Sequence, residues 1–124
     1  MAWDVYVTDD VKQWARDLKE TDPASYEQVG AAIDVLAETG PDLGRPLVDR
    51  VKGSSVHNLK ELRPGSTARS EIRILFVFDP WRSAILLVAG DKSGNWDKWY
   101  RSAIPHAEGL LVRYLKERAQ EEQP

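Results

Sequence analysis

The chain has 124 residues, of which 42% are hydrophobic and 30% are charged, and its formal net charge is −3. These values are typical of a globular protein with one core, so we expect a single domain over residues 1–124 and exclude a fibrous or wholly disordered chain. Because the sequence contains no cysteine, disulfides, thiolate metal sites and a thiol nucleophile are excluded. The first residues lack the pattern of a signal peptide, and the longest apolar run, residues 84–89, is too short for a bilayer, which predicts a cytoplasmic protein with no membrane partner.

The charge is distributed unevenly along the chain. Residues 1–44 contain three Lys and Arg against ten Asp and Glu, a net −7, and residues 102–124 contain three against four, a net −1. Residues 45–101 contain eleven against six, a net +5. Because a polyanion responds to the local field, this basic block is compatible with a nucleic-acid partner despite an overall pI near 5.4.

The first forty residues predict one strand and two helices. Trp3–Val7 alternates in strand fashion and is expected at a sheet edge. Thr8, followed by two aspartates, resembles a helix N-cap, and the first helix runs to about Glu20. Pro23 favours a second helix start, and that helix ends near Gly40. The acidic side chains of these helices could bind a basic segment of a partner, with a solvated surface as the alternative.

The remaining elements form a meander and a last helix. Residues 40–55 are rich in Gly and Pro, which predicts an irregular loop with exposed basic residues, among them Arg45, Arg50 and Lys52. Three antiparallel strands are then expected at Val56–Arg63, Glu71–Phe78 and Ser83–Gly90. A helical stripe over residues 107–115 follows, and residues 119–124 are expected to form a disordered tail.

The predicted fold class is therefore α+β, with a twisted four-stranded antiparallel sheet, two N-terminal helices and a C-terminal helix. In the strand Glu71–Phe78, alternate residues divide between two faces. We expect the helices to cover one face only, so that Arg73 points away from them onto a bare face.

Cations and aromatic rings are interleaved along the predicted sheet. Lys and Arg can neutralise phosphates while planar rings stack on unpaired bases, a combination that suits RNA. The alternative is that the cations decorate a solvated surface and the tryptophans fill gaps under a loop. The set comprises Lys60, Arg63, Arg69, Arg73, Lys92, Lys98 and Arg101, with Trp96, Trp99 and Tyr100.

Four segments in order, LKELRPGS, EIRILFVFD, AILLVAGDKSG and WYRSAIPHAEGLL, resemble toxins of the RelE/ParE superfamily, and the HigB-type branch most of all. With the two preceding helices, the resemblance covers nearly the whole chain. It implies a RelE-like fold and the toxin of a type II toxin–antitoxin system. The implied activity is metal-independent, ribosome-dependent cleavage of mRNA with no cofactor, and the implied partners are mRNA, the ribosome and a cognate helix-turn-helix antitoxin.

The resemblance also implies site residues. Arg63 and Arg73 match phosphate-binding arginines, Lys92 matches the basic residue after the last strand, and Tyr100 matches an aromatic near the start of the final helix. On chemical grounds we assign Lys92 to the side of the leaving group and Tyr100 to stacking on a base or orienting the 2′-hydroxyl. Lys60 lies near a basic strand position and completes the implied catalytic set. The remaining members of the interleaved set are expected to bind RNA, namely Arg69, Trp96, Lys98, Trp99 and Arg101.

Cleavage of RNA without a metal needs a base for the 2′-hydroxyl proton, cations beside the phosphorane and an acid for the 5′ oxygen. The products would carry a 2′,3′-cyclic phosphate and a 5′-hydroxyl. Lys60 or His57 would serve as the base. Alternatively, His57 is a structural residue at the start of a strand that forms only local hydrogen bonds. We expect His106 to have a packing or capping role.

Other functions remain open from the sequence. A ParE-like protein that inhibits DNA gyrase by binding would share the fold, and a catalytically weak toxin homologue would share most residues. A metal-dependent nuclease that uses Asp79, Asp91 or Asp97 is disfavoured, because the chain has two histidines 49 positions apart and no closely spaced acidic cluster.

Overall fold

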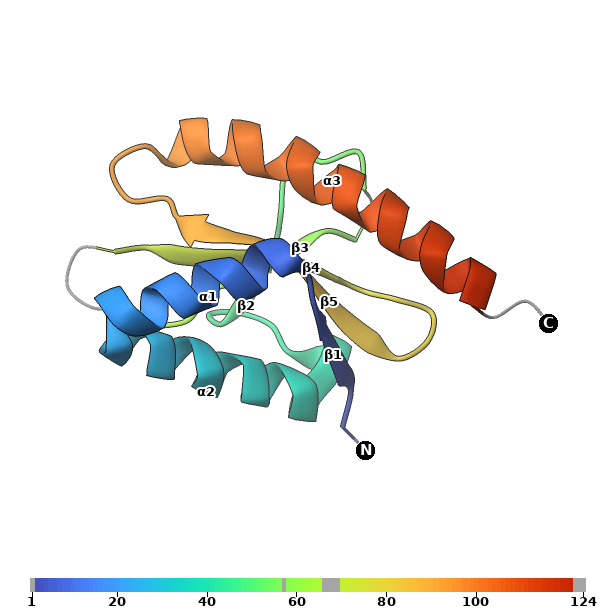
Figure 1. Ribbon diagram of the computed structural model, residues 1–124, viewed down its shortest axis with the longest axis horizontal. Helices are drawn as coiled ribbons and strands as arrows, with labels where there is room; N and C mark the ends of the chain where they lie inside the picture. The colour runs from blue at the N-terminus through green and yellow to red at the C-terminus, as the bar shows by residue number, and fades with distance from the viewer. Residues whose placement is uncertain (1, 57, 66–69, 122–124) are drawn as a thin grey trace.

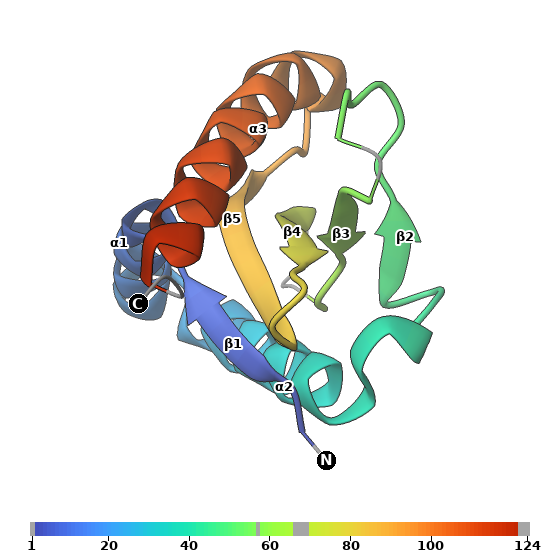
Figure 2. The ribbon, with the colours of Figure 1, turned by 90° about the vertical axis from the view of Figure 1, so that its right-hand side faces the viewer.

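The computed structural model describes residues 2–56, 58–65 and 70–121. A central sheet separates two layers of helices, with α1 and α2 on one side and α3 on the other, as Figures 1 and 2 show. The elements in chain order are β1 (Asp4–Val7), α1 (Asp9–Thr21), α2 (Pro23–Thr39), a 3₁₀ turn η1 (Gly40–Asp42), β2 (Val48–Arg50), β3 (Lys60–Leu62), β4 (Ile72–Phe78), β5 (Ser83–Asp91) and α3 (Trp96–Glu121). The predicted α+β class is confirmed.

The sheet has five strands in the order β1-β5-β4-β3-β2, where the sequence predicts four. The additional strand, β2, lies in the segment expected to be a loop, and it pairs antiparallel with β3 over three residues. Such a short strand between Gly and Pro residues has little periodicity of its own and depends on its neighbour for hydrogen bonds. The edge position of Trp3–Val7 is confirmed, but β1 pairs parallel with β5, so the sheet is mixed.

Both faces of the sheet carry helices, which corrects the expectation of one bare face. Ile72, Ile74 and Phe76 pack with α1 and α2. The alternate residues Leu75 and Val77 pack against Ala103, Ala107 and Leu111 of α3. Arg73 shares the parity of Leu75 and Val77, so it points to the α3 side instead of a helix-free surface.

The two N-terminal helices begin where the sequence predicts. Thr8 Oγ1 accepts a hydrogen bond from Val11 N, and Thr8 also donates to the carbonyl of Leu87, which ties the start of α1 to β5. Asp22 caps α2 by accepting from Ser25 N, with Pro23 in the first turn. These caps satisfy backbone donors that a helix start leaves without intrahelical partners.

Helix α3 is longer than its apolar stripe predicts at both ends. It starts at Trp96 and includes Pro105, and it continues to Glu121, so residues 119–121 are helical instead of part of a tail. Near its C-terminal part, the Tyr114 hydroxyl donates to Asp79 Oδ2 at 2.6 Å, while Asp79 Oδ1 accepts from the backbone of Trp81 and Ser83. This buried carboxylate anchors the β4–β5 turn to the helix. Within the described residues no helix is long and apolar enough to span a membrane.

The start of α3 is fixed by a close contact between Trp99 and the backbone of β5. A Cβ built on Gly90 would lie 2.4 Å from Nε1 of the Trp99 indole, so only glycine allows the ring to lie this close to the strand. Gly90 pairs with Arg73 on β4. The glycine therefore lets the first turns of α3 approach the edge of the sheet where Arg73 lies.

We predict that Gly90→Ala lowers the free energy of unfolding by about 1–3 kcal/mol, because the methyl group must displace Trp99. Gly109→Ala is the matched control, since a Cβ at this position of α3 meets nothing within 4 Å. The control should be about 1 kcal/mol more stable than wild type, as expected for replacing a helical glycine. Urea unfolding of both variants tests the contact, and equal stability of the two would contradict it.

A candidate RNA-binding groove beside the start of α3

A solvent-open groove of about 400 Å³ lies between β2, β3 and the first turns of α3. We call it the cationic groove, because five of its lining side chains are positively charged. It contains three of the five predicted catalytic residues, Arg63, Lys92 and Tyr100. Its lining consists of Arg45, Asp49, Arg50, Val51, Lys52, Glu61, Arg63, Lys92, Trp96, Asp97 and Tyr100.

Arg63 occupies the middle of an ion-pair network. Its Nη2 lies 2.7 Å from Glu61 Oε2 and 3.1 Å from Asp49 Oδ2, and its Nε donates to Glu61 at 2.8 Å. Burial lowers the pKa of the guanidinium, but the hydrogen bond and charge of Glu61, together with Asp49, outweigh this effect and raise it. One third of the Arg63 side chain is exposed, so the group remains open to a ligand in the groove.

Arg73 lies behind Glu61 and does not line the groove. The β3–β4 register, continued by one residue, places Arg63 opposite Arg73, a like-charge pairing that is unfavourable without an anion. Glu61 supplies this anion, with Oε2 at 3.9 Å from Arg73 Nε. That Nε is buried and makes no hydrogen bond to any residue that the structure describes, while Nη1 donates to the carbonyl of Ile72.

Tyr100 links α3 to this network. Its hydroxyl donates to Glu61 Oε1 at 2.5 Å, and Glu61 is only 3% exposed. Burial, and then the bond to Glu61, raise the pKa of Tyr100 well above its ordinary value. The phenol therefore stays protonated throughout the physiological range and acts as a hydrogen-bond donor.

Lys92 lies at the other side of the groove. Its backbone N donates to the Glu71 carbonyl, and its Nζ is 3.4 Å from the Glu71 carboxylate. The ammonium also lies 5.6 Å from the Trp96 ring centroid and 5.8 Å from that of Tyr100. Trp96 is 57% exposed, so its ring presents open surface beside this cation.

The other predicted site residues are not brought together here. Lys60 is adjacent to Glu61 on β3 and so faces the opposite side of the sheet, where its Nζ lies 5.4 Å from the Phe78 ring. Trp99 is half-buried against Gly90 and does not line the groove, and its RNA-binding role stays a prediction. Lys98 is exposed outside the groove lining, and Arg101 lines an adjoining pocket with Lys52. His57 and Arg69 lie outside the described residues.

The structure adds groove residues that the sequence interpretation assigned to a loop. Arg45, Asp49 and Arg50 come from β2 and the turn before it, and Glu61 of β3 is not among the predicted site residues. Asp49 is opposite Glu61 in the β2–β3 register. The backbone N–H of Arg50 and the guanidinium of Arg45 hold the pKa of Asp49 below its usual value. The apolar residues Leu47, Val48 and Val51, which flank the polar pair Asp49 and Arg50, are the signal that could have revealed this strand.

His106 and Asp91, which the sequence singled out, have structural contacts elsewhere, whereas Asp97 lines the cationic groove. His106 Nε2 lies 2.6 Å from Asp10 Oδ2 and bridges α3 to α1. Asp91 accepts from the backbone of Glu71 and Ser93, which lowers its pKa despite the opposing effect of burial. Among the described residues no three His, Asp or Glu side chains cluster as a metal site would require.

The buried tyrosines predict a loss of stability at high pH. The pKa values of Tyr100 and Tyr114 are both raised, by burial and then by hydrogen bonds to Glu61 and Asp79 respectively. Below about pH 10, the ordinary pKa of tyrosine, their contribution is fully present. As the pH rises above that value, the unfolded chain loses these protons while the folded chain retains them, so stability falls.

Urea unfolding at pH 8 and pH 11 should therefore show a smaller alkaline loss for Tyr100→Phe and for Tyr114→Phe than for wild type. The Tyr100→Phe/Tyr114→Phe double variant should show the smallest loss of stability between pH 8 and pH 11. An alkaline loss that is the same in all four proteins would show that these hydroxyls do not resist ionisation in the folded state.

Comparisons with known proteins identify the family of this chain. Residues 16–112 match the family described as phage derived protein Gp49-like (DUF891). The chain is 53% identical over 108 residues to putative toxin HigB2 of Mycobacterium tuberculosis, covering 87% of this chain and 54% of that protein. It is 51% identical over 105 residues to putative toxin HigB3 of the same organism, covering 85% of this chain and 87% of that one. The chain thus spans about half the length of HigB2 and most of HigB3.

The fold has a solved counterpart. A mutant of the E. coli toxin RelE in the free state superposes with a TM-score of 0.59 at 14% sequence identity, covering 85% of this chain and 97% of that one. This similarity concerns the fold, whereas the family match and the sequence identities carry the assignment. The chain belongs to the Gp49-like family, is related to proteins named as putative HigB-type toxins, and has the RelE fold.

Proposed function

We propose that this protein is the toxin of a type II toxin–antitoxin pair and that it cleaves mRNA on the ribosome in the cationic groove, without a metal ion. The observation that carries the proposal is the convergence of Arg63, Lys92 and Tyr100 on one open groove, in a chain whose relatives are named as toxins. A cognate antitoxin of the helix-turn-helix type holds the toxin inactive in this proposal.

The cations of the groove suit a scissile phosphate. Arg63 can exchange its solvent-side bond to Asp49 for a phosphate oxygen while it keeps its bonds to Glu61. Arg73 lies behind Glu61, and its side chain is only 15% exposed. Its positive charge is therefore weakly screened by solvent. Fixed cations that face the developing phosphorane stabilise it without reorganisation at the moment of reaction.

Tyr100 and Glu61 provide a path for the proton of the 2′-hydroxyl. As the 2′ oxygen attacks phosphorus, its proton passes to Tyr100 Oη while the phenolic proton moves to Glu61 Oε1. The bond from phosphorus to the 5′ oxygen breaks, and Lys92 donates a proton to that oxygen. The products are a 2′,3′-cyclic phosphate and a 5′-hydroxyl end. This path replaces Lys60, which lies on the opposite face of the sheet, as the source of the base.

Arg63→Ala should reduce cleavage of a translated mRNA by about 10²–10³-fold, because it removes the groove's central phosphate cation. Lys60→Ala is the matched control, a strand cation directed to the other face, and it should cleave as wild type does. Mapped RNA ends after induction of each variant, with growth as a second readout, provide the measurement. If Lys60→Ala were inactive and Arg63→Ala active, the groove would not be the active site. If the protein arrested growth and inhibited DNA supercoiling by gyrase but produced no new 5′-hydroxyl ends, a gyrase-binding toxin would be favoured.

The proton path makes a separate prediction. Tyr100→Phe and Glu61→Gln should each reduce cleavage by about 10²-fold, and the double variant should lose little more, because both belong to one path. Single-turnover cleavage of ribosome-bound mRNA by the purified variants tests this. Losses that multiply in the double variant would mean that the two residues act independently.

A further inference from the structure

A second groove lies between α1 and α2, on the face of the sheet opposite the cationic groove. Its volume is about 470 Å³, and its floor is mostly apolar. Trp14, Tyr26 and Ile33 are half-buried there, and Val29 is buried. Gly30 leaves the floor open, because a Cβ at this position would meet nothing within 4 Å. We call this the hairpin groove.

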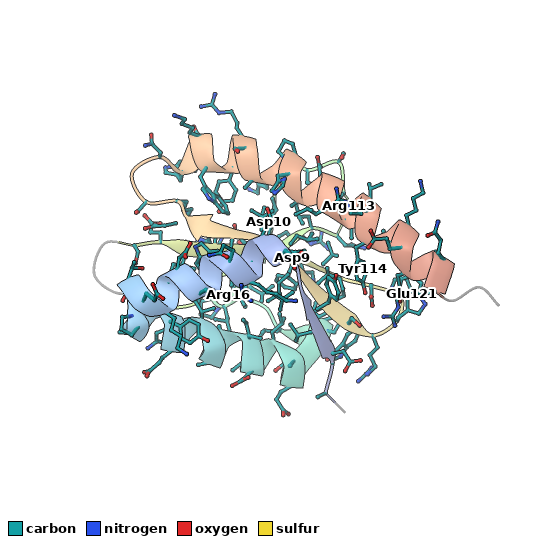
Figure 3. The ribbon with its side chains drawn as sticks, in the orientation of Figure 1. Asp9, Asp10, Arg16, Arg113, Tyr114 and Glu121 are labelled. Atoms are coloured by element: carbon teal, nitrogen blue, oxygen red, sulfur yellow. The ribbon has the colours of Figure 1, made fainter. Side chains whose placement is uncertain are left out.

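Charge is segregated around the hairpin groove. Lys12, Arg16 and Lys19 are the only Lys and Arg in residues 1–44, and all three are exposed and line it. Of the ten acidic residues in the same segment, Glu27 alone lines it. The three cations are spaced four and three residues apart, which places them on one stripe of α1. Figure 3 labels Arg16 on α1, which runs side by side with α2.

We propose that the hairpin groove binds an acidic, amphipathic segment of the cognate antitoxin. The apolar floor can bind apolar side chains on one face of such a segment, and the row of cations beside it can bind carboxylates on the adjacent face. The inference rests on the proposed function, which supplies the antitoxin. It also reverses the expectation from composition, in which acidic helices attract a basic segment, because the acidic side chains of α1 and α2 lie almost entirely outside the groove.

The position of the groove separates antitoxin binding from RNA cleavage. The hairpin groove is formed by α1 and α2, whereas Arg63 and Tyr100 lie on the α3 side of the sheet. A segment bound between α1 and α2 therefore anchors the antitoxin without touching the cleavage residues. Substitutions in the hairpin groove should weaken neutralisation and leave the toxin active.

The test uses the full chain and, as probe, the full-length protein encoded by the gene adjacent to that of the toxin. Gly30→Leu fills the floor, and Arg16→Glu reverses the central cation of the row. The matched controls are Gly109→Leu, at an equally open helical glycine on α3, and Lys116→Glu, at an exposed cation on α3. Calorimetric titration should show affinity reduced about tenfold or more for the two groove variants and unchanged for the controls. Hydrogen exchange of the wild-type complex should show protection over residues 11–33.

All four variants should arrest growth when expressed alone, which establishes that they fold and remain active. Wild-type affinity in Gly30→Leu and Arg16→Glu would overturn the hairpin groove as the binding site, with the proposed function intact. Growth arrest by wild type with no binding to the adjacent protein would remove the antitoxin assignment and this inference with it. Absence of growth arrest by wild type would instead overturn the proposed toxin function.

Discussion

The shared carboxylate of Glu61 is the interaction on which the candidate site depends. It accepts from Tyr100 of α3 and from Arg63 at the end of β3, and it lies within ion-pair distance of Arg73 on β4. Two arginines opposite each other in a sheet would repel, and a buried phenol would lack an acceptor, if this anion were absent. The contacts that pack α3 onto the sheet also orient the side chains of the cationic groove. These side chains are therefore preorganised.

The close approach of α3 completes this arrangement. Gly90 lets the Trp99 indole lie against β5, and the next residue, Tyr100, then reaches Glu61. A tryptophan that the sequence suggested for RNA contact thus contributes to packing, while its exposed neighbour Trp96 remains beside Lys92. The two sides of the sheet also divide the proposed roles, with RNA cleavage on the α3 side and antitoxin binding between α1 and α2.

Local signals in the sequence were sufficient for the elements with strong patterns. The cap at Thr8, the helix start at Pro23 and the alternation of β4 follow from nearest-neighbour chemistry, and they are present in the structure. The resemblance to HigB-type toxins was correct as well. What could not be predicted depends on long-range pairing: the three-residue strand β2, the parallel register of β1, and the approach of α3 to the second face.

The same limit explains why the sequence could not place the side chains of the site. Lys60 and Glu61 are adjacent in sequence, and only the strand register decides which of them faces the groove, because one residue's shift reverses every side chain. Arg73 was expected on an open surface, but α3 covers that face and leaves Arg73 behind Glu61. Glu61, which is not among the predicted site residues, is the residue that organises the cations.

The most direct test of this account is a double-mutant cycle on the free energy of unfolding, with Glu61→Ala and Tyr100→Phe. The two substitutions should show a coupling energy of about 1.5–3 kcal/mol, as expected for a buried hydrogen bond to a charged group. Glu61→Ala combined with Tyr114→Phe, whose hydroxyl bonds Asp79 instead, should show additive effects. Additive effects for Glu61 and Tyr100 would contradict the claim that this carboxylate holds the first turns of α3 on the sheet.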